Sequence, residues 1–118
     1  MTTPLDPDRF RELRLAGPLS FLQAVDAIDD FLRTAEADGM RRVLVDVRGL
    51  AGLASPDLAA RAWMLRRFAA TTRGRVKVAM LAPPELQDAE RFGVVFARSV
   101  GLEADVFEHE DDARRWLA

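Results

Sequence analysis

The sequence predicts an α/β domain built on a mainly parallel sheet of four or five strands with about four helices. Segments with strand character alternate with segments of helical periodicity along the 118 residues, and this alternation indicates helices that cross over between parallel strands. Two strands, 41–47 and 75–81, are continuous apolar runs, which is typical of strands buried on both faces. No repeat, linker or low-complexity tract interrupts the chain, so one domain over residues 1–118 is expected.

The first strand and the first helix have clear boundaries. Residues 9–17 alternate polar and apolar side chains, which favours an edge strand, and we expect this strand to run antiparallel to the others. Apolar residues then recur every three or four positions, which predicts a helix. This helix lies between a capping box formed by Ser20 and Gln23 and a C-terminal glycine, Gly39.

The rest of the chain continues the alternation, so that the predicted order is β-α-β-α-β-α-β-α. In sheets of this kind, ligands usually meet the loops at the carboxyl ends of the strands, which are residues 48–55 and 81–85 here. The predicted elements after the strand 41–47 are a helix from Ser55 to about Thr71, a strand at 75–81, a helix from Glu85 to Val100, a strand at 104–107 and a helix at 111–118.

Composition narrows the function classes. A formal charge of −2, from 17 basic and 19 acidic residues, gives no overall attraction to nucleic acid. The absence of Cys excludes disulfides and thiolate nucleophiles and fits a reducing cytoplasm. No secretory signal follows Met1 and no apolar run could cross a bilayer, so a cytoplasmic location is expected, with peripheral membrane contact as an option.

Motifs for cofactors, metals and catalysis are absent from the sequence. There is no Walker loop and no G-x-G-x-x-G. His109 is the single His, and its acidic surroundings, EHEDD, lack the second His or the loop glycine that metal sites use. A triad of Ser55, His109 and an Asp has no support in the spacing. We therefore expect no metal, no cofactor and no enzymatic activity.

Five short segments resemble the SpoIIAA-like family of small bacterial proteins, whose fold is that of STAS domains. The resemblance implies a STAS-like fold and implies binding of a partner protein or a small anionic ligand instead of catalysis. For some members of the family it implies membrane contact and an apolar ligand, by analogy with lipid-transfer domains. The segments are VLVDVRGL at 43–50, KVAMLAPPE at 77–85, D..RFG at 88–93, GLEADVF at 101–107, and A..WL at 113–117 after acidic residues.

Ser55 has two interpretations. The resemblance places it where many STAS domains carry a phosphorylated Ser, although antagonists of anti-sigma factors typically have Asp-Ser-Ser-Gly there and this chain has Ala-Ser-Pro-Asp at 54–57. The other interpretation is a helix N-cap, because Ser caps well, Pro is favoured at the first helical position and Asp complements the helix dipole. Ser55 is thus a candidate phosphorylation site and the predicted N-cap of the second helix.

The helix 55–71 carries the main candidate binding surface. At 100° per residue, Trp63 lies about 140° and Arg67 about 180° from Leu58, and Met64 is also off the buried side. Trp63, Met64 and Arg67 are therefore candidates for contact with a membrane interface or a protein partner. The alternative is that Trp63 packs against a loop or against the first helix. The predicted buried stripe is Leu58, Ala62, Leu65 and Ala69.

Three arginines form a candidate anion site. Arg91 and Arg98 are seven residues apart and share one face of the predicted helix 85–100, and Arg48 ends the strand 41–47. The alternative is a solvated face with weak ion pairs.

Together these observations predict a non-enzymatic binding or regulatory domain. It would engage a protein partner, a membrane surface or an amphiphilic ligand through the helix 55–71 and the loops at the carboxyl ends of the strands. A second copy of the chain is included among the partners, and nucleic acid is not. Two alternatives stay open: a regulator switched by phosphorylation of Ser55, and an enzyme with a polar pocket formed by Arg48, Ser55 and Asp88.

Overall fold

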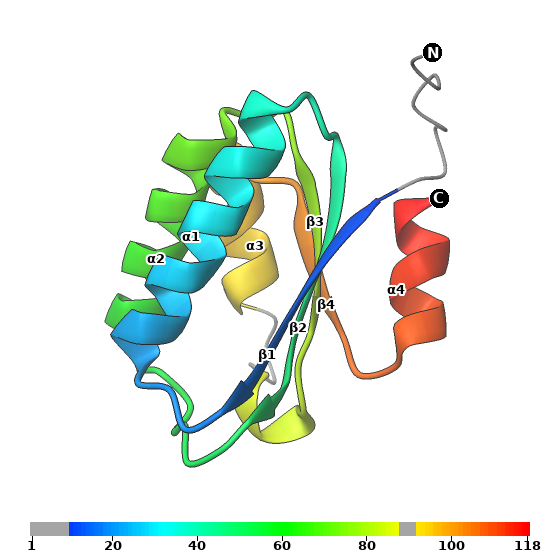
Figure 1. The fold of residues 1–118 in the computed structure, drawn as a ribbon. Coiled ribbons are helices and arrows are strands. Elements are labelled where there is room, and N and C mark those ends of the chain that lie inside the picture. Colours follow the sequence, from blue (N-terminus) through cyan, green and yellow to red (C-terminus); the bar gives the residue numbers. More distant parts are fainter. Residues whose placement is uncertain (1–9, 88–91) are drawn as a thin grey trace.

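The computed structural model describes residues 10–87 and 92–118, which form a four-stranded sheet with helices on both faces (Figure 1). The predicted α/β class is confirmed, with four strands and four α-helices in these residues. The elements are β1 (Arg11–Gly17), α1 (Phe21–Ala37), β2 (Arg42–Leu50), α2 (Leu58–Thr72), β3 (Lys77–Leu81), the 3-10 helix η1 (Pro84–Leu86), α3 (Phe92–Ser99), β4 (Ala104–Phe107) and α4 (Glu110–Leu117).

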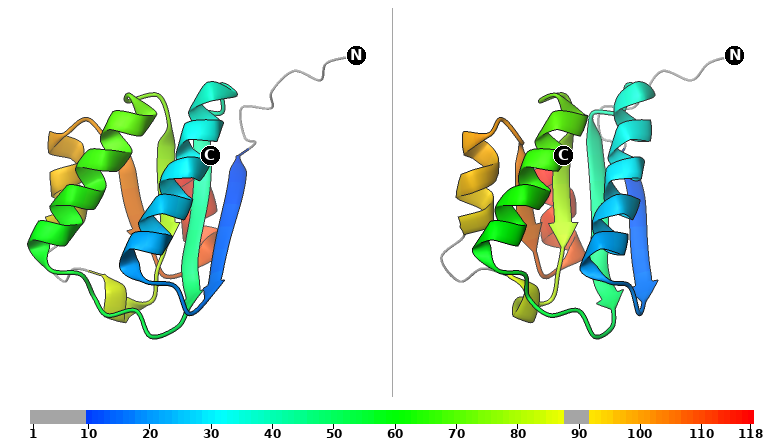
Figure 2. Two further views of the ribbon diagram at one scale, coloured as in Figure 1. Left: turned by 60° about the vertical axis from the view of Figure 1, so that its left-hand side comes forward. Right: turned by 90° about the vertical axis from the view of Figure 1, so that its left-hand side faces the viewer.

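The strands follow one another in the sheet in the order of the sequence, β1-β2-β3-β4, and all three pairs are parallel. Helices α1, α2 and α3 cover one face, and α4 lies on the other face (Figures 1 and 2). Each crossover leads to the adjacent strand, so the three connecting helices form one layer. None of the helices in the described residues has both the length and the apolar character of a bilayer span.

The direction of β1 corrects the sequence prediction. β1 runs parallel to β2, with Leu13 opposite Val45, and is not antiparallel as expected. Exposure does alternate along β1, as it should in an edge strand, but alternation carries no information about direction. The direction follows from α1, because a strand followed by a helix across one face of the sheet joins the next strand in parallel.

Strand β2 is buried on both faces and separates two apolar cores. Val43, Val45 and Val47 belong to the core under the α1–α3 layer, whereas Leu44 belongs to the core under α4. The continuous apolar run in the sequence is therefore explained by two covered faces. The core under α4 consists of Leu44, Ala79, Leu81, Ala113 and Leu117.

The N-terminus of α1 agrees with the sequence prediction and that of α2 does not. Ser20 Oγ accepts the backbone N–H of Gln23, and the Gln23 side chain accepts the N–H of Ser20. The N-cap of α2 is Asp57, whose carboxylate accepts the N–H of Ala60 at 2.8 Å. The prediction of Ser55 as N-cap is wrong because Asp caps as well as Ser and lies two residues closer to the first helical turn.

The buried stripe of α2 is rotated relative to the prediction. Leu65 is buried as expected, but Leu58 is 57% exposed, and Phe68 and Thr72 are buried instead. The stripe therefore passes through Arg61, Leu65, Phe68 and Thr72, at spacings of four, three and four residues. Turning the helix this way buries an aromatic ring, which removes more apolar surface from water than burying alanines.

The predicted helix 85–100 is interrupted. After η1, Gln87 has extended backbone angles, with φ −89° and ψ 151°, and α3 begins at Phe92. The Gln87 side chain donates a hydrogen bond to the carbonyl of Ala82 at 3.0 Å. This bond ties the turn to the end of β3.

A buried carboxylate joins α1 to α2. The Asp29 side chain is 1% exposed and pairs with Arg33 at 2.8 Å and with Arg67 of α2 at 3.3 Å. The Thr71 hydroxyl also donates to it, and Arg67 pairs further with Asp26 at 2.7 Å. A buried carboxylate without partners would be costly, so these contacts hold the two helices in one relative position.

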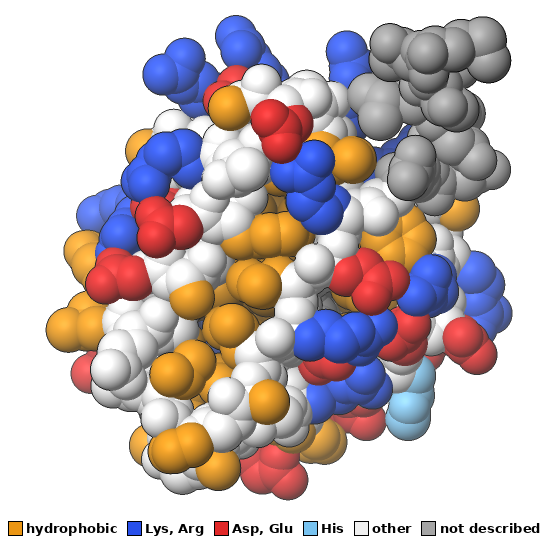
Figure 3. Space-filling view, in the orientation of Figure 1, with side chains coloured by type: hydrophobic (Ala, Val, Ile, Leu, Met, Phe, Trp, Pro, Cys, Tyr) orange, Lys and Arg blue, Asp and Glu red, His pale blue; other side chains and the backbone are white. Residues whose placement is uncertain are grey.

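Helix α4 is held to the sheet by ion pairs as well as by its apolar core. Arg14 of β1 contacts Glu110 at 2.8 Å and Asp46 at 2.7 Å, and Arg48 contacts Asp46 at 2.9 Å. Arg114 pairs with Glu110 within the helix at 2.7 Å. Figure 3 shows these opposite charges gathered on the α4 side of the molecule.

We predict that Asp57→Ala lowers the free energy of unfolding by about 0.5 to 2 kcal/mol, because the N–H of Ala60 loses its acceptor. Ser55→Ala should cost less than about 0.5 kcal/mol, because Ser55 does not cap the helix. Asp57→Asn is the matched control and should retain most of the stability. Urea unfolding measures all three variants. A larger loss for Ser55→Ala than for Asp57→Ala would contradict the assignment of the cap.

We also predict that acid weakens the contact between β1, β2 and α4. Arg48, followed by Arg14, holds the pKa of Asp46 below its ordinary value although burial opposes this. Because the pKa is lower in the folded state, the contribution is present above the unfolded pKa of about 4 and is lost as the pH falls through the folded pKa.

The measurement is the free energy of unfolding in urea between pH 7 and pH 3. Asp46→Asn should reduce the dependence on pH, whereas Asp111→Asn, at an exposed position of α4, should change it less. An equal effect of the two variants would disprove the role of Asp46.

Candidate functional site

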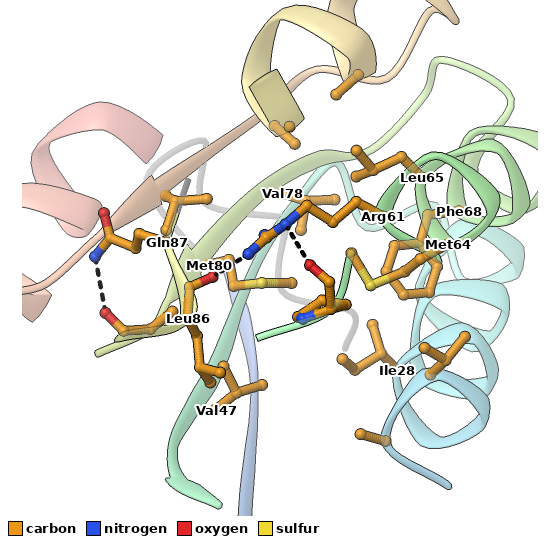
Figure 4. A pocket seen from close by; sticks show the side chains of 18 of the residues that line it. Ile28, Val47, Arg61, Met64, Leu65, Phe68, Val78, Met80, Leu86 and Gln87 are labelled. Carbon is orange, nitrogen blue, oxygen red and sulfur yellow. Dashed lines mark hydrogen bonds between the residues drawn. The ribbon is translucent and has the colours of Figure 1, made fainter. Parts of the chain in front are cut away.

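An apolar pocket of about 130 Å³ lies between the helix layer and the sheet, toward the carboxyl ends of β2 and β3 (Figure 4). Ile28 of α1 and Met64 of α2 line it from the helix side, and Val47 and Met80 line it from the sheet. Leu86 of η1 closes one end. The two methionines have flexible side chains that can adapt to an irregular ligand.

Small side chains explain why this space is unfilled. Interiors are normally packed with few voids larger than a water molecule, and a gap between a helix layer and a sheet has to be filled by side chains from both. Here three different elements and one loop position contribute only a methyl group or a hydrogen to the lining. These positions are Ala24, Ala82, Gly93, Ala97 and Ala104.

Arg61 of α2 is the cationic group of the pocket lining. Its Nη2 donates to Ser55 Oγ at 2.6 Å and to the carbonyl of Leu86 at 2.9 Å, and its Nε donates to the carbonyl of Pro56 at 3.2 Å. The guanidinium thereby connects the loop before α2 to η1 (Figure 4). In the part of the chain that the structure describes, Arg61 has no carboxylate within 4.0 Å.

The rotation of α2 places Arg61 in this position. Arg61 lies one turn before Leu65 and two turns before Phe68, so its side chain starts on the buried stripe and follows it toward the end of the sheet. The sequence analysis missed Arg61 because it set the stripe on Leu58. The available signal was the spacing of Arg61, Leu65, Phe68 and Thr72, in which a charged residue continues an apolar stripe.

Two other polar groups border the pocket and already have partners. Gln87 donates to the carbonyl of Ala82, and the Asp105 carboxylate accepts the N–H of Val106 at 2.7 Å. The interior of the pocket is therefore apolar, with its polar groups at the periphery.

Two of the residues predicted from the sequence are found at the pocket. Met64 lines it, and Ser55 accepts the hydrogen bond from Arg61. Met64 was grouped with Trp63 as an outward patch, but the rotation of the helix turns Met64 toward the sheet.

Trp63 and Arg67 lie on the side of α2 that faces α1. Trp63 is 43% exposed and its ring is 6.2 Å from that of Phe21, centroid to centroid. The Arg67 guanidinium is 5.7 Å from the Trp63 ring and is engaged by Asp26 and Asp29. Trp63 thus combines packing against the first helix with partial exposure, and the partly exposed Arg67 forms ion pairs with α1.

Two arginines of the predicted anion site, Arg48 and Arg98, lie on opposite faces of the sheet. Arg48 contacts Asp46 and lies 3.8 Å from Glu110 of α4, so it lies on the face of the sheet opposite α2. Arg98 is exposed on α3, in the other helix layer. Arg91 and Asp88 lie outside the described residues. Arg48 contacts the α4 side of the sheet and Ser55 contacts Arg61 of α2, so the polar pocket predicted at Arg48, Ser55 and Asp88 stays a prediction.

Apolar surface accompanies the pocket. Figure 3 shows apolar side chains along the helix layer and at the end of the molecule where the loops after the strands lie. Leu22, Leu58 and Trp63 are exposed near the starts of α1 and α2.

Comparisons with known proteins bear on the fold. No protein-family model matches the chain, and no curated protein matches it. One solved structure is similar: an uncharacterized protein of the DUF3478 family from Shewanella loihica PV-4, which has a SpoIIAA-like fold. It is 26% identical in sequence, the match covers 91% of this chain and 82% of that one, and the TM-score is 0.53. The order of helices and strands, the parallel sheet and this match together show that the chain has a SpoIIAA-like fold.

Proposed function

We propose that this chain is a non-enzymatic domain that binds a small amphiphilic molecule. The apolar part of the ligand occupies the pocket between the helix layer and the sheet, and its polar end lies at Arg61. One observation carries the proposal: an apolar pocket and a hydrogen-bonding cation occur at the same place. Ligand sites are typically apolar cavities with a few placed polar groups that fix orientation.

The size of the pocket supports a small ligand. Its volume is about 130 Å³, while cavities for drug-sized ligands are about 300 to 1,000 Å³. An apolar cavity of about 150 Å³ is large enough for benzene. The enclosed part of the ligand therefore has about six carbon atoms, and a larger molecule would extend beyond the pocket.

The chemistry of the lining supports binding without turnover. The Ser55 hydroxyl is bonded to Arg61, and a guanidinium remains protonated in proteins, so it cannot accept a proton from Ser55. His109 precedes α4 on the other face of the sheet. The described part of the pocket thus offers no nucleophile with an adjacent base.

Contact with a partner protein or a membrane surface is a further use of the same helix. Its support is the partial exposure of Trp63 together with Leu58 and Leu22. Arg67 contributes less to it than the sequence suggested, because Asp26 and Asp29 already engage its guanidinium.

Phosphorylation of Ser55 is a second candidate function, favoured by one contact. Ser55 is exposed and lies 2.6 Å from Arg61 Nη2, so a phosphate would gain charge-assisted hydrogen bonds there. If Ser55 is a switch, the intact mass of protein isolated from its own cells should include one phosphate, and Ser55→Ala protein should lack it. Unmodified protein throughout growth would contradict this candidate.

The ligand-binding proposal is tested by filling the pocket. Gly93 lines it, and the contact that a Cβ at this position would make with the described residues is with Leu65 Cδ1, at 3.9 Å. Gly93→Leu should therefore place a side chain in the pocket and abolish binding of 1-hexanol, while Gly93→Ala should leave most of the space open. Binding is followed by NMR of the methionine methyl groups, since Met64 and Met80 line the pocket.

Wild-type protein should show saturable shifts of Met64 and Met80, and Met40, which is not part of the lining, serves as the internal reference. Gly93→Ala should remain as stable as the wild type or gain up to about 1 kcal/mol, because Ala favours a helix over Gly. Hexanol shifts that persist unchanged in Gly93→Leu, or no shifts in the wild type, would exclude this pocket as the binding site.

A further inference from the structure

We infer that the pocket is selective for a monoanionic aliphatic carboxylate of about six carbons, with Arg61 as the residue that binds its headgroup. This inference rests on the proposed function and adds the chemical class of the ligand. It depends on the partners of Arg61, on the donors that Arg61 has available and on the charges around it.

Arg61 differs in its hydrogen-bond partners from the arginines whose ion pairs hold the helices and the sheet together. Arg14, Arg48, Arg67 and Arg114 each contact at least one carboxylate within 3 Å. Within the described residues, Arg61 instead donates to one hydroxyl and two backbone carbonyls. A half-buried guanidinium beside an apolar surface, bonded only to neutral oxygens, gains most from an added anion.

The geometry leaves donors for such an anion. Nε and Nη2 make the hydrogen bonds to the loop and to η1, and Nη1 makes none within the described residues. Nη1 and Nη2 form one edge of the guanidinium fork, which matches the two oxygens of a carboxylate. The exposed Ser55 hydroxyl can exchange its bond with Arg61 for water, so the cost of freeing Nη2 is small.

The surrounding charges favour one negative charge over two. Glu85 lies within η1 and Asp57 directly precedes α2, and Arg61 bridges the segments that contain them. A carboxylate meets the cation with one charge, while a phosphate monoester would bring a second charge near these two acidic side chains and near Asp105 of the pocket lining. The volume of about 130 Å³ limits the enclosed chain to about six carbons.

The test compares three probes of one chain length: hexanoate, 1-hexanol and hexylammonium. In wild-type protein at pH 7, hexanoate is expected to bind about tenfold more tightly than hexanol, and hexylammonium more weakly than hexanol. In Arg61→Met, which keeps a long side chain without the charge, hexanoate and hexanol should bind within about twofold of each other. Arg61→Lys should recover part of the preference for hexanoate.

The outcomes separate this inference from the proposed function. Equal binding of hexanoate and hexanol by the wild type overturns the role of Arg61 and leaves the pocket as a ligand site. Failure of all three probes to shift Met64 and Met80 overturns the proposed function itself. Because the wild-type series is decisive alone, the inference stays testable even if Arg61→Met does not fold, and Gly93→Leu shows whether hexanoate occupies the pocket.

Discussion

The need to cover strand β2 on both faces determines the rest of this fold. Its valines require the layer formed by α1, α2 and α3, and Leu44 on the opposite face requires α4. Asp46 lies between these apolar residues and faces α4, so Arg14 and Arg48 must neutralise a carboxylate that is nearly inaccessible to water. The apolar core and the ion pairs on the α4 side are thus two consequences of one buried strand.

The pocket is the place where this covering is incomplete. Larger side chains could occupy this space of about 130 Å³ and add packing contacts that the present lining does not make. A ligand with an apolar chain would restore the missing contacts. The small side chains that leave the space poorly packed are therefore the same ones that make room for a ligand. Such a conflict between function and stability is common.

Hydrophobic periodicity was sufficient to predict the class of fold, the order of its elements and the burial of 43–47 and of most of 76–81. Periodicity was insufficient where two local arrangements of the chain have similar energies, as for the cap and the orientation of α2. Asp57 and Ser55 are both good caps, and only the packing of α2 decides between them. A buried stripe through Leu58 and one through Phe68 differ by a rotation of the helix about its axis that is smaller than the roughly 100° between consecutive residues. This rotation brings Arg61 to the pocket. The direction of β1 depended on the crossover, which the alternation of its side chains could not reveal.

The consecutive strand order has a consequence for how the chain acquires its structure. Each strand pairs with the strand made just before it, so the sheet requires no pairing between its first and last strands. The separation along the chain between contacting strands stays close to the length of one helix and its loops, which keeps the loop-closure cost of each pairing below that of a pairing between the first and last strands. Such a sheet can grow strand by strand as the polypeptide leaves the ribosome. Helix α4 is made after the other described elements, and its ion pair from Glu110 to Arg14 of β1 then connects the two ends of the described chain.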